Sequence, residues 1–155
     1  MKERYQSKVA VSLILTRLTG DGKEILLQRR CNTGYMDGKY EISCSGHLEK
    51  GESLSKAIIR EAKEELGIDI QENDLQLVFI NHSYKEDYMQ IYFTAQKFKG
   101  IPQIIEKDKC DDLRWFNINN LPNHMIERIR YAIKDIESGI IYANYSDEDF
   151  NIINV

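Results

Sequence analysis

One amphipathic helix near the middle of the chain constrains the fold more than any other feature of the sequence. The segment 53–66 starts at Ser53, a residue type that caps helix N-termini well. It is followed by Gly67, which can adopt the left-handed conformation that ends helices. An apolar row recurs along it at i, i+4 spacing: Leu54, Ile58, Ala62 and Leu66. This pattern predicts a helix over 53–66 that buries one face.

Three glutamates flank the apolar row of this helix. At 3.6 residues per turn, Glu61, Glu64 and Glu65 fall within about 100° of one another. Like charges at i+3 and i+4 cost roughly a few tenths of a kcal/mol in an exposed helix, and more where water is partly excluded. Arg60 can relieve Glu64, but no lysine is placed to relieve Glu61 or Glu65. A divalent cation with oxygen ligands fits this pattern, whereas a solvated acidic face is the alternative for this fragment alone.

Strand-like segments lie on both sides of the helix. Residues 9–15 alternate apolar with smaller or polar side chains, and a turn at 19–23 leads to a returning strand at 25–28. The remaining predicted elements are a loop over 31–40, strands at 75–81, 88–98 and 112–116, and a second helix from about Asn123 to Gly139. This order predicts an α/β sandwich around a mixed sheet, in one domain over 1–155, with no assignment for the tail after Tyr142.

Composition excludes several classes of protein. The 155 residues carry 21 Lys and Arg against 25 Asp and Glu, a net charge of −4 that is poorly suited to gripping a nucleic-acid backbone. Cys31, Cys44 and Cys110 form an odd set without a CxxC pair. A disulfide framework or structural zinc site is therefore not expected, and a reducing cytoplasm is the simplest setting. The apolar stretch at 9–15 is too short to cross a membrane.

The acidic helix is part of a longer pattern of fixed positions. The pattern runs Gly46, five residues, Glu52, seven residues, Arg-Glu-x-x-Glu-Glu-x-Gly, and then an apolar residue. It resembles the signature box of the Nudix hydrolases, of the MutT type, and covers residues 46–68 without a gap. Ala62 alone stands where the family prefers a bulkier aliphatic residue, and the family often accepts Ala there.

The resemblance extends over most of residues 8–138. A strand ending at Arg30, a strand with Trp115-Phe116, and a Leu-Pro turn before a helix follow the usual order of that fold. The resemblance implies an α/β/α sandwich with a central mixed sheet. It also implies a loop–helix–loop motif that binds Mg²⁺ or Mn²⁺ and hydrolyses a nucleoside diphosphate linked to another group. Metals bridging the pyrophosphate would neutralise charge, lower the pKa of a bound water and orient it for in-line attack on phosphorus.

The resemblance also assigns roles within the box. Metal binding and water activation are implied for three acids: Glu61, Glu64 and Glu65. The carbonyl of Gly46 is implied as a further metal ligand. Glu52 and Arg60 are expected to form an ion pair that fixes the loop to the helix, and Glu52 could also approach a metal through water.

Four residues outside the box complete the predicted site. The resemblance implies a further catalytic acid from the loop before the late strand, and Glu106 is the first choice, with a solvated charged loop as the alternative. Other acids of that loop are Asp108, Asp111 and Asp112. Arg30 is a candidate phosphate contact, and Glu41 lies close enough before the box to face the site. Asn123 is near the position where MutT-type members place a base-reading Asn, although Asn also caps helices well.

The identity of the substrate stays open at this level. A base could stack on an aromatic side chain such as that of Tyr35, Tyr84 or Phe116. Nucleotide sugars, dinucleotides and damaged nucleotides of the 8-oxo-dGTP type are all compatible. The expected partner is a small nucleotide rather than a nucleic-acid polymer or a membrane, and a homodimer is left open.

Two other functional classes share this fold. One is a Nudix-like module that senses a nucleotide without hydrolysing it, and the other is an isomerase of isoprenoid diphosphates. Sensing modules often lose box acids, and the isomerases depart from the box and need a catalytic Cys elsewhere. The intact box therefore favours hydrolysis.

Overall fold

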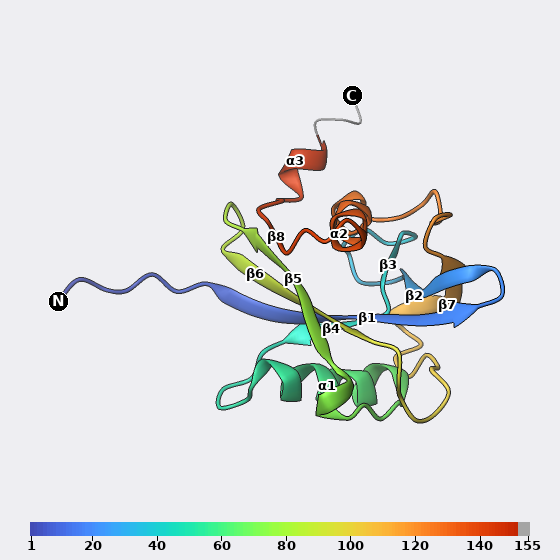
Figure 1. Cartoon of the computed structure of the whole chain (residues 1–155). Helices are drawn as coiled ribbons and strands as arrows, with labels where there is room; N and C mark the ends of the chain where they lie inside the picture. Colours follow the sequence, from blue (N-terminus) through green and yellow to red (C-terminus); the bar gives the residue numbers. More distant parts are fainter. Residues whose placement is uncertain (152–155) are drawn as a thin grey trace.

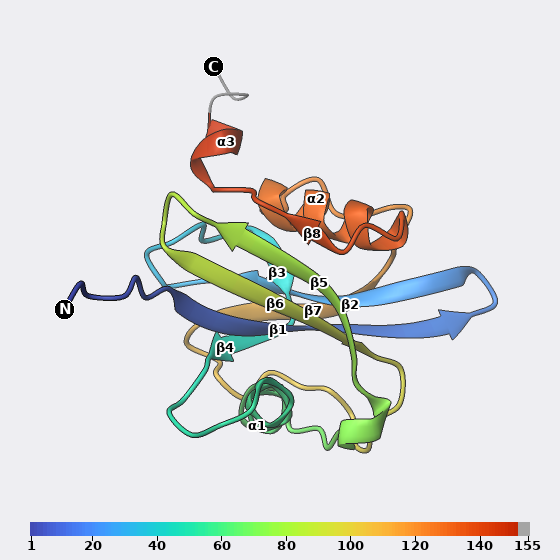
Figure 2. The ribbon, with the colours of Figure 1, turned by 60° about the vertical axis from the view of Figure 1, so that its left-hand side comes forward.

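One mixed sheet runs through the protein, and its two longer helices cover opposite faces of it (Figures 1 and 2). The structure is a computed structural model and describes residues 1–151. The strands are β1 (Lys8–Thr19), β2 (Gly22–Arg30), β3 (Tyr40–Ile42), β4 (Cys44–His47), β5 (Gln76–Ser83), β6 (Tyr88–Ala95), β7 (Cys110–Asn117) and β8 (Tyr142–Ala143). Their order is β3-β2-β1-β6-β5-β8, with β4 paired to β1 and β7 paired to β2. The β1–β6 and β5–β8 pairs are parallel and the others antiparallel.

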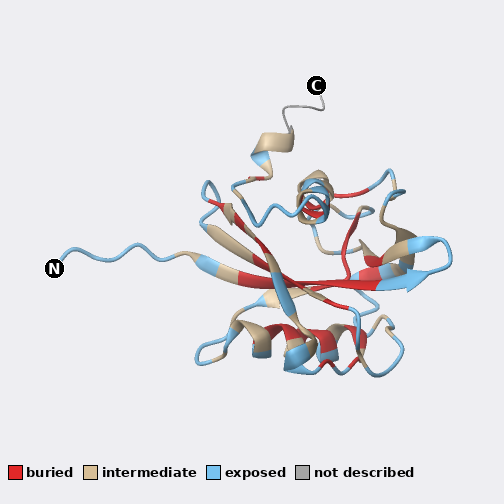
Figure 3. Cartoon of the chain, viewed as in Figure 1, coloured by how far each residue is buried: buried red, intermediate tan, exposed pale blue. Residues whose placement is uncertain are grey.

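The long strand β1 organises the core because its side chains alternate between the two faces of the sheet. Val11, Leu13 and Leu15 pack in the apolar cluster on the side of helix α1 (Leu54–Leu66). Ile14 packs in the opposite cluster, on the side of helix α2 (Glu127–Glu137). Figure 3 shows the buried residues concentrated along β1 and on the inward sides of the helices. Each fully buried aliphatic side chain contributes about 1.5–3 kcal/mol, so these two clusters fix both helices on the sheet.

Helix α1 follows its sequence signals closely. The Ser53 side chain accepts a hydrogen bond from the backbone N–H of Lys56, and Gly67 ends the helix in the left-handed region at φ 69°. The apolar row is buried, with Ile58 and Ala62 fully enclosed. The predicted helix over 53–66 is confirmed, and its acids are held on one edge of the buried face.

Helix α2 begins later than the sequence predicted. Its N-cap is Ile126, so the expectation that Asn123 starts or caps the helix is wrong. The reason is a backbone pairing with β3: the N–H of Tyr40 donates to the carbonyl of His124, and the N–H of Ile126 donates to the carbonyl of Tyr40. These bonds hold residues 124–126 in extended conformation, which delays the first helical turn.

The structure also contains several short elements that the sequence did not predict. Two short strands, β3 and β4, follow the predicted loop at 31–40 and were not anticipated. A 3₁₀ turn, η1 (Glu72–Asp74), precedes β5. The unassigned tail forms β8, which pairs with β5 at the edge of the sheet, and a short helix, α3 (Glu148–Asn151). The predicted domain over 1–155 includes residues 152–155, which lie outside the described residues. Among residues 1–151, no helix is both long and apolar enough to span a membrane.

Candidate active site

One acid of helix α1, Glu61, packs directly against strand β4. The Glu61 side chain points at the sheet and the residue is only 9% exposed. A Cβ built on Gly46 would collide with the Glu61 carboxylate. Gly46 is therefore required for a close approach, because any side chain there would displace the acid.

We expect Gly46→Ala to disturb this contact strongly. The added methyl must push the Glu61 carboxylate away from β4, and because this is the end of a flexible side chain the cost lies near the lower end of the roughly 1–3 kcal/mol typical of overpacking. The matched control is Gly20→Ala, because a Cβ at Gly20 meets no atom within 4 Å. Thermal melts of both variants should show a lower melting temperature for Gly46→Ala only. Equal melting temperatures would contradict the tight contact.

Arg60 on α1 makes polar contacts with three glutamates and one backbone carbonyl. Its Nε and Nη2 donate to the two carboxylate oxygens of Glu52 at 2.7 and 3.1 Å, so the predicted ion pair between loop and helix is present and bidentate. Its Nη1 lies 2.8 Å from Glu61 and 3.2 Å from Glu64. Its Nη2 also donates to the carbonyl of His47 at 3.3 Å. The expectation that Glu61 has no positive neighbour is thus wrong, because the long arginine stem carries the guanidinium across to it.

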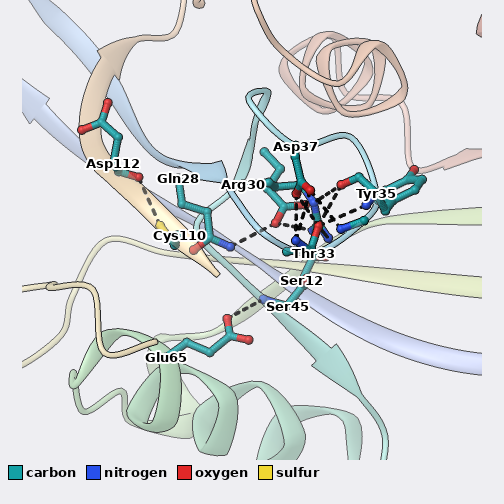
Figure 4. A network of polar contacts seen from close by, with 12 residues as sticks. Ser12, Gln28, Arg30, Thr33, Tyr35, Asp37, Ser45, Glu65, Cys110 and Asp112 are labelled. Atoms are coloured by element: carbon teal, nitrogen blue, oxygen red, sulfur yellow. Dashed lines mark hydrogen bonds and ion pairs between the residues drawn. The ribbon is translucent and has the colours of Figure 1, made fainter. Parts of the chain in front are cut away.

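Glu65 has no such cation among its hydrogen-bond partners in the described chain. Figure 4 shows its side chain reaching from α1 toward the sheet, where it accepts a hydrogen bond from the backbone N–H of Ser45 at 3.2 Å. Burial raises the pKa of Glu65 to about 8, and the nearby charges of Glu61, Glu106 and Glu41 act in the same direction. Burial also raises the pKa of Glu61, against the opposing effect of Arg60. Negative charge is therefore concentrated here beyond what the adjacent arginine neutralises.

The structure brings Glu106 to this cluster. Glu106 and Glu65 line the same small cavity, of about 30 Å³, between the end of α1 and β7. The other acids of that loop are engaged elsewhere: Asp111 pairs with Arg29 at 2.7 Å, and Asp112 with Arg114 at 2.6 Å. Asp108 contacts the 31–32 segment through its carbonyl. Of the four predicted loop acids, Glu106 is thus the one that faces the box.

A larger cavity, of about 280 Å³, adjoins the acids on the other side of β4. Arg30 and Glu41 both line it, and their side chains form an ion pair at 2.8 Å. Arg30 also donates to the Tyr35 carbonyl and the Thr33 hydroxyl, at 2.7 and 2.9 Å, as seen in Figure 4. Glu41 is nearly enclosed, and burial raises its pKa. Ser45 links the cavity to the acids of α1, because it lines the cavity and its backbone N–H donates to Glu65.

Three of the predicted substrate contacts lie outside this cavity: Asn123, Phe116 and Tyr84. Asn123 is exposed in the loop ahead of α2 and does not line it, because residues 124–126 are held against Tyr40. Phe116 packs edge-on against Tyr40, with ring centroids 5.0 Å apart, and is used by the core. Tyr84 is exposed beside His82. Of the three aromatic candidates, only Tyr35 lines the cavity.

The sequence analysis missed three charged residues of the cavity wall, one of which is Glu86, in the turn between β5 and β6. Arg128, on the first turn of α2, and Asp147, in the C-terminal tail, both line it and pair at 2.8 Å. An isolated arginine and aspartate nineteen positions apart carry no pattern that separates them from ordinary surface charges. Their signal would have been the position of Arg128 on the inward face of α2, had the true start of that helix been known.

The acids of α1 have the donor chemistry for a divalent cation, but their side chains are not arranged around one. Within residues 1–151, no three His, Cys, Asp or Glu side chains are gathered tightly enough to hold a metal as they stand. Arg60 instead draws Glu61 and Glu64 to itself. The chemistry of the donors nevertheless fits Mg²⁺ or Mn²⁺, because both prefer carboxylate and carbonyl oxygens. Burial is the main cause that raises the pKa of Glu61 and of Glu65, neighbouring acids add to it, and a bound cation would favour the ionised carboxylates.

Comparisons with known proteins agree with this geometry. A family model described as the NUDIX domain matches residues 6–136. The NAD-capped RNA hydrolase NudC of Pseudomonas putida (strain W619) is 29% identical over 119 residues, which cover 77% of this chain and 40% of that protein. The chain thus spans about 40% of the length of the curated relatives it matches.

Solved structures give the same result for the fold. The MutT NUDIX hydrolase from Burkholderia pseudomallei is 26% identical with a TM-score of 0.70, covering 84% of this chain and 98% of that one. The NUDIX domain of Shewanella oneidensis NrtR, complexed with ADP ribose, is 16% identical with a TM-score of 0.66, covering 88% and 89%, and is similar in fold. The predicted α/β/α fold with a central mixed sheet is confirmed.

Proposed function

The chain belongs to the Nudix hydrolase family, and we propose that it hydrolyses the pyrophosphate bond of a nucleoside diphosphate derivative with Mg²⁺ or Mn²⁺. One observation carries this proposal: the side chains of Glu61, Glu65 and Glu106 lie close together, and Glu61 contacts Gly46 of strand β4. A cavity of about 280 Å³ adjoins these acids, close to the lower end of the range typical for small-molecule sites.

The residues that would hold the metal are the three box glutamates, Glu61, Glu64 and Glu65, together with the carbonyl of Gly46. When bound, a divalent cation neutralises phosphate charge and lowers the pKa of a water molecule. Glu106 reaches the same cluster from the loop before β7, which supports a role as proton acceptor or further ligand. Arg60, tied to Glu52, holds the loop and the helix in register.

The cavity would bind the organic part of the substrate. Arg30 and Glu41 line it as an ion pair, and the Arg30 guanidinium also lies over the ring of Tyr35. Arg30 is already bonded to three partners, so we propose that it positions the wall formed by Tyr35 and reaches a phosphate only at its edge. Asn123 is not part of the proposal, because it lies away from the cavity.

The similar proteins widen the range of substrates to be tested. The curated relatives are named for NAD-capped RNA, and one neighbouring structure holds ADP ribose. The expectation that no nucleic-acid polymer binds is therefore not carried forward. Damaged nucleoside triphosphates of the 8-oxo-dGTP type remain candidates through the likeness to MutT enzymes.

The proposal is tested by a panel of nucleotides with and without metal. The panel contains nucleoside triphosphates, 8-oxo-dGTP, NAD⁺, ADP ribose, a nucleotide sugar and an NAD-capped RNA. We expect phosphate, pyrophosphate or mononucleotide release with Mg²⁺ or Mn²⁺, no release in excess EDTA, and full recovery when metal is returned. Turnover that survives thorough chelation, or no turnover of any panel member with metal, would refute the proposal.

A further inference from the structure

The C-terminal tail builds one wall of the cavity, although it lies beyond the part of the chain that matches the family model. That match ends at residue 136. Strand β8 adds to β5, and the chain then continues to the short helix α3 (Figure 2). Of the tail, Asp147 lines the cavity directly.

Buried hydrogen bonds fix the tail in this place. The Asn81 side chain, which is 1% exposed, donates to the carbonyl of Tyr145 at 2.9 Å and accepts from its N–H at 2.8 Å. The hydroxyls of Ser83 and Ser146 lie 3.2 Å apart, and both residues are buried. Breaking these pairs would leave buried polar groups unsatisfied, so the tail is a built part of the wall.

Asp147 joins two other elements across the mouth of the cavity. It accepts a hydrogen bond from Nε of Arg128 at 2.8 Å and another from the hydroxyl of Tyr35. The side chains of Arg128 and Asp147 are 17% and 28% exposed, so the pair is only partly screened by water. The one cation on this wall is thereby neutralised by the tail.

The charges of the lining favour one kind of ligand group. Its two cations, Arg30 and Arg128, face three acids: Glu41, Glu86 and Asp147. Arg30 donates to Glu41, Thr33 and Tyr35, and Arg128 donates to Asp147 at 2.8 Å and to the Tyr92 hydroxyl at 3.4 Å, so each arginine is paired with one acid. Among the lining residues, no arginine is left without a partner for an anionic group. Tyr88 and Gln90 add neutral hydrogen-bonding groups.

We propose that Asp147 is a specificity-determining residue that restricts this cavity to an uncharged or cationic, hydrogen-bonding end of the substrate and rejects an anionic end. The proposal rests on the proposed function, since it concerns the organic group attached to the cleaved diphosphate. An anionic group would have to compete with Asp147 for Arg128 and would meet the excess acid of the lining.

The test compares the binding of three dinucleotides that differ only in where a negative charge is added. NAD⁺ is the reference, its nicotinate analogue carries a carboxylate in place of the carboxamide, and NADP⁺ carries a phosphate on the adenosine ribose. Binding is measured by calorimetry with Mg²⁺ in full-length protein carrying Glu64→Gln, which is expected to suppress turnover. The same background then receives Asp147→Asn. The matched control is Asp149→Asn, from the same tail, whose carboxylate pairs with Lys85 at 2.8 Å and does not line the cavity.

With Asp147 in place, one of the two anionic analogues should bind at least about tenfold more weakly than NAD⁺, which identifies the end that enters the cavity. Asp147→Asn keeps the shape of the side chain but removes the charge that neutralises Arg128. The ratio of the affinities for NAD⁺ and for the weaker anionic analogue should therefore fall to about threefold or less. Asp149→Asn should leave it unchanged. Three results would overturn the inference. They are equal affinities for the three dinucleotides in Glu64→Gln, the same preference for NAD⁺ after Asp147→Asn is added, and no binding of any dinucleotide. Turnover of the nucleotide panel without such a preference would sink this inference alone, whereas absence of all turnover would sink the proposed function.

Discussion

Glu65→Gln is expected to lower turnover by roughly 10²-fold or more while making the metal-free protein more stable at pH 8. The substitution keeps the shape of the side chain and a carbonyl oxygen for the N–H of Ser45. It removes a carboxylate that would bind metal or activate water, and positioned acid–base groups of this kind contribute about 10²–10⁴-fold to rates. The two effects have opposite signs because a charge that serves the reaction destabilises the empty site.

The stability effect depends on pH in a defined window. The pKa of Glu65 is raised in the folded protein from 4.5 to about 8, so between these values the folded state binds more protons than the unfolded state. The free energy of unfolding of the metal-free protein therefore falls as pH rises through this window. Each pKa unit corresponds to about 1.4 kcal/mol, so the loss attributable to Glu65 by pH 8 is on the order of several kcal/mol.

Denaturant unfolding in EDTA at several pH values measures this contribution. The curves of native protein and Glu65→Gln should diverge from about pH 5 upward, with the variant more stable. Glu3→Gln, in the exposed N-terminal segment, should follow the native curve. Parallel curves for native protein and Glu65→Gln would mean that Glu65 carries no buried charge.

Arg60→Ala is expected to give the largest loss of stability on α1. The guanidinium binds Glu52 through two hydrogen bonds and also holds Glu61 and Glu64. Its side chain and that of Glu52 are 23% and 14% exposed. Removing one partner of this partly buried ion pair leaves the surviving charge of Glu52 unpaired, so Arg60→Ala should unfold at a clearly lower denaturant concentration than native protein. Activity should fall as well, since the loop that follows the Gly46 strand β4 loses its tie to the helix.

Two further variants separate this role from the loss of a surface charge. Lys63→Ala, on the same helix, removes an exposed pair with Asp69 and should change stability by less than about 1 kcal/mol. Arg60→Lys keeps the charge but cannot make the bidentate contact, so it should lie between native protein and Arg60→Ala. If Arg60→Ala unfolds at the same denaturant concentration as Lys63→Ala, Arg60 is not the tie between loop and helix.

The sequence predicted the parts of the fold whose signals are local. Ser53, Gly67 and the apolar row specify α1 within a single segment, and the alternation in β1 does the same for that strand. The box acids share one helix, so their common face follows from helical geometry. Glu106 was singled out only by resemblance, and the structure places it beside Glu65.

Features made by contacts between distant segments could not be predicted. The late start of α2 depends on the pairing of Tyr40 with residues 124–126, which overrides the local preference of Asn123 for a helix cap. Strands β3 and β4 have three and four residues, too few for a periodic pattern. The contact of Arg60 with Glu61 depends on a side-chain conformation rather than on spacing. The pairing of Asp147 with Tyr35 joins positions 112 apart.

The most direct test of the central claim, that the acids of α1 facing β4 form a metal-dependent hydrolytic site, is a calorimetric titration of Mn²⁺ into native protein and Glu65→Gln. Mn²⁺ takes the same oxygen ligands as Mg²⁺. The account predicts saturable binding to native protein, affinity at least about tenfold weaker in Glu65→Gln, and native affinity in Glu3→Gln. The same Mn²⁺ affinity in native protein and Glu65→Gln, or no Mn²⁺ binding to native protein, would contradict it.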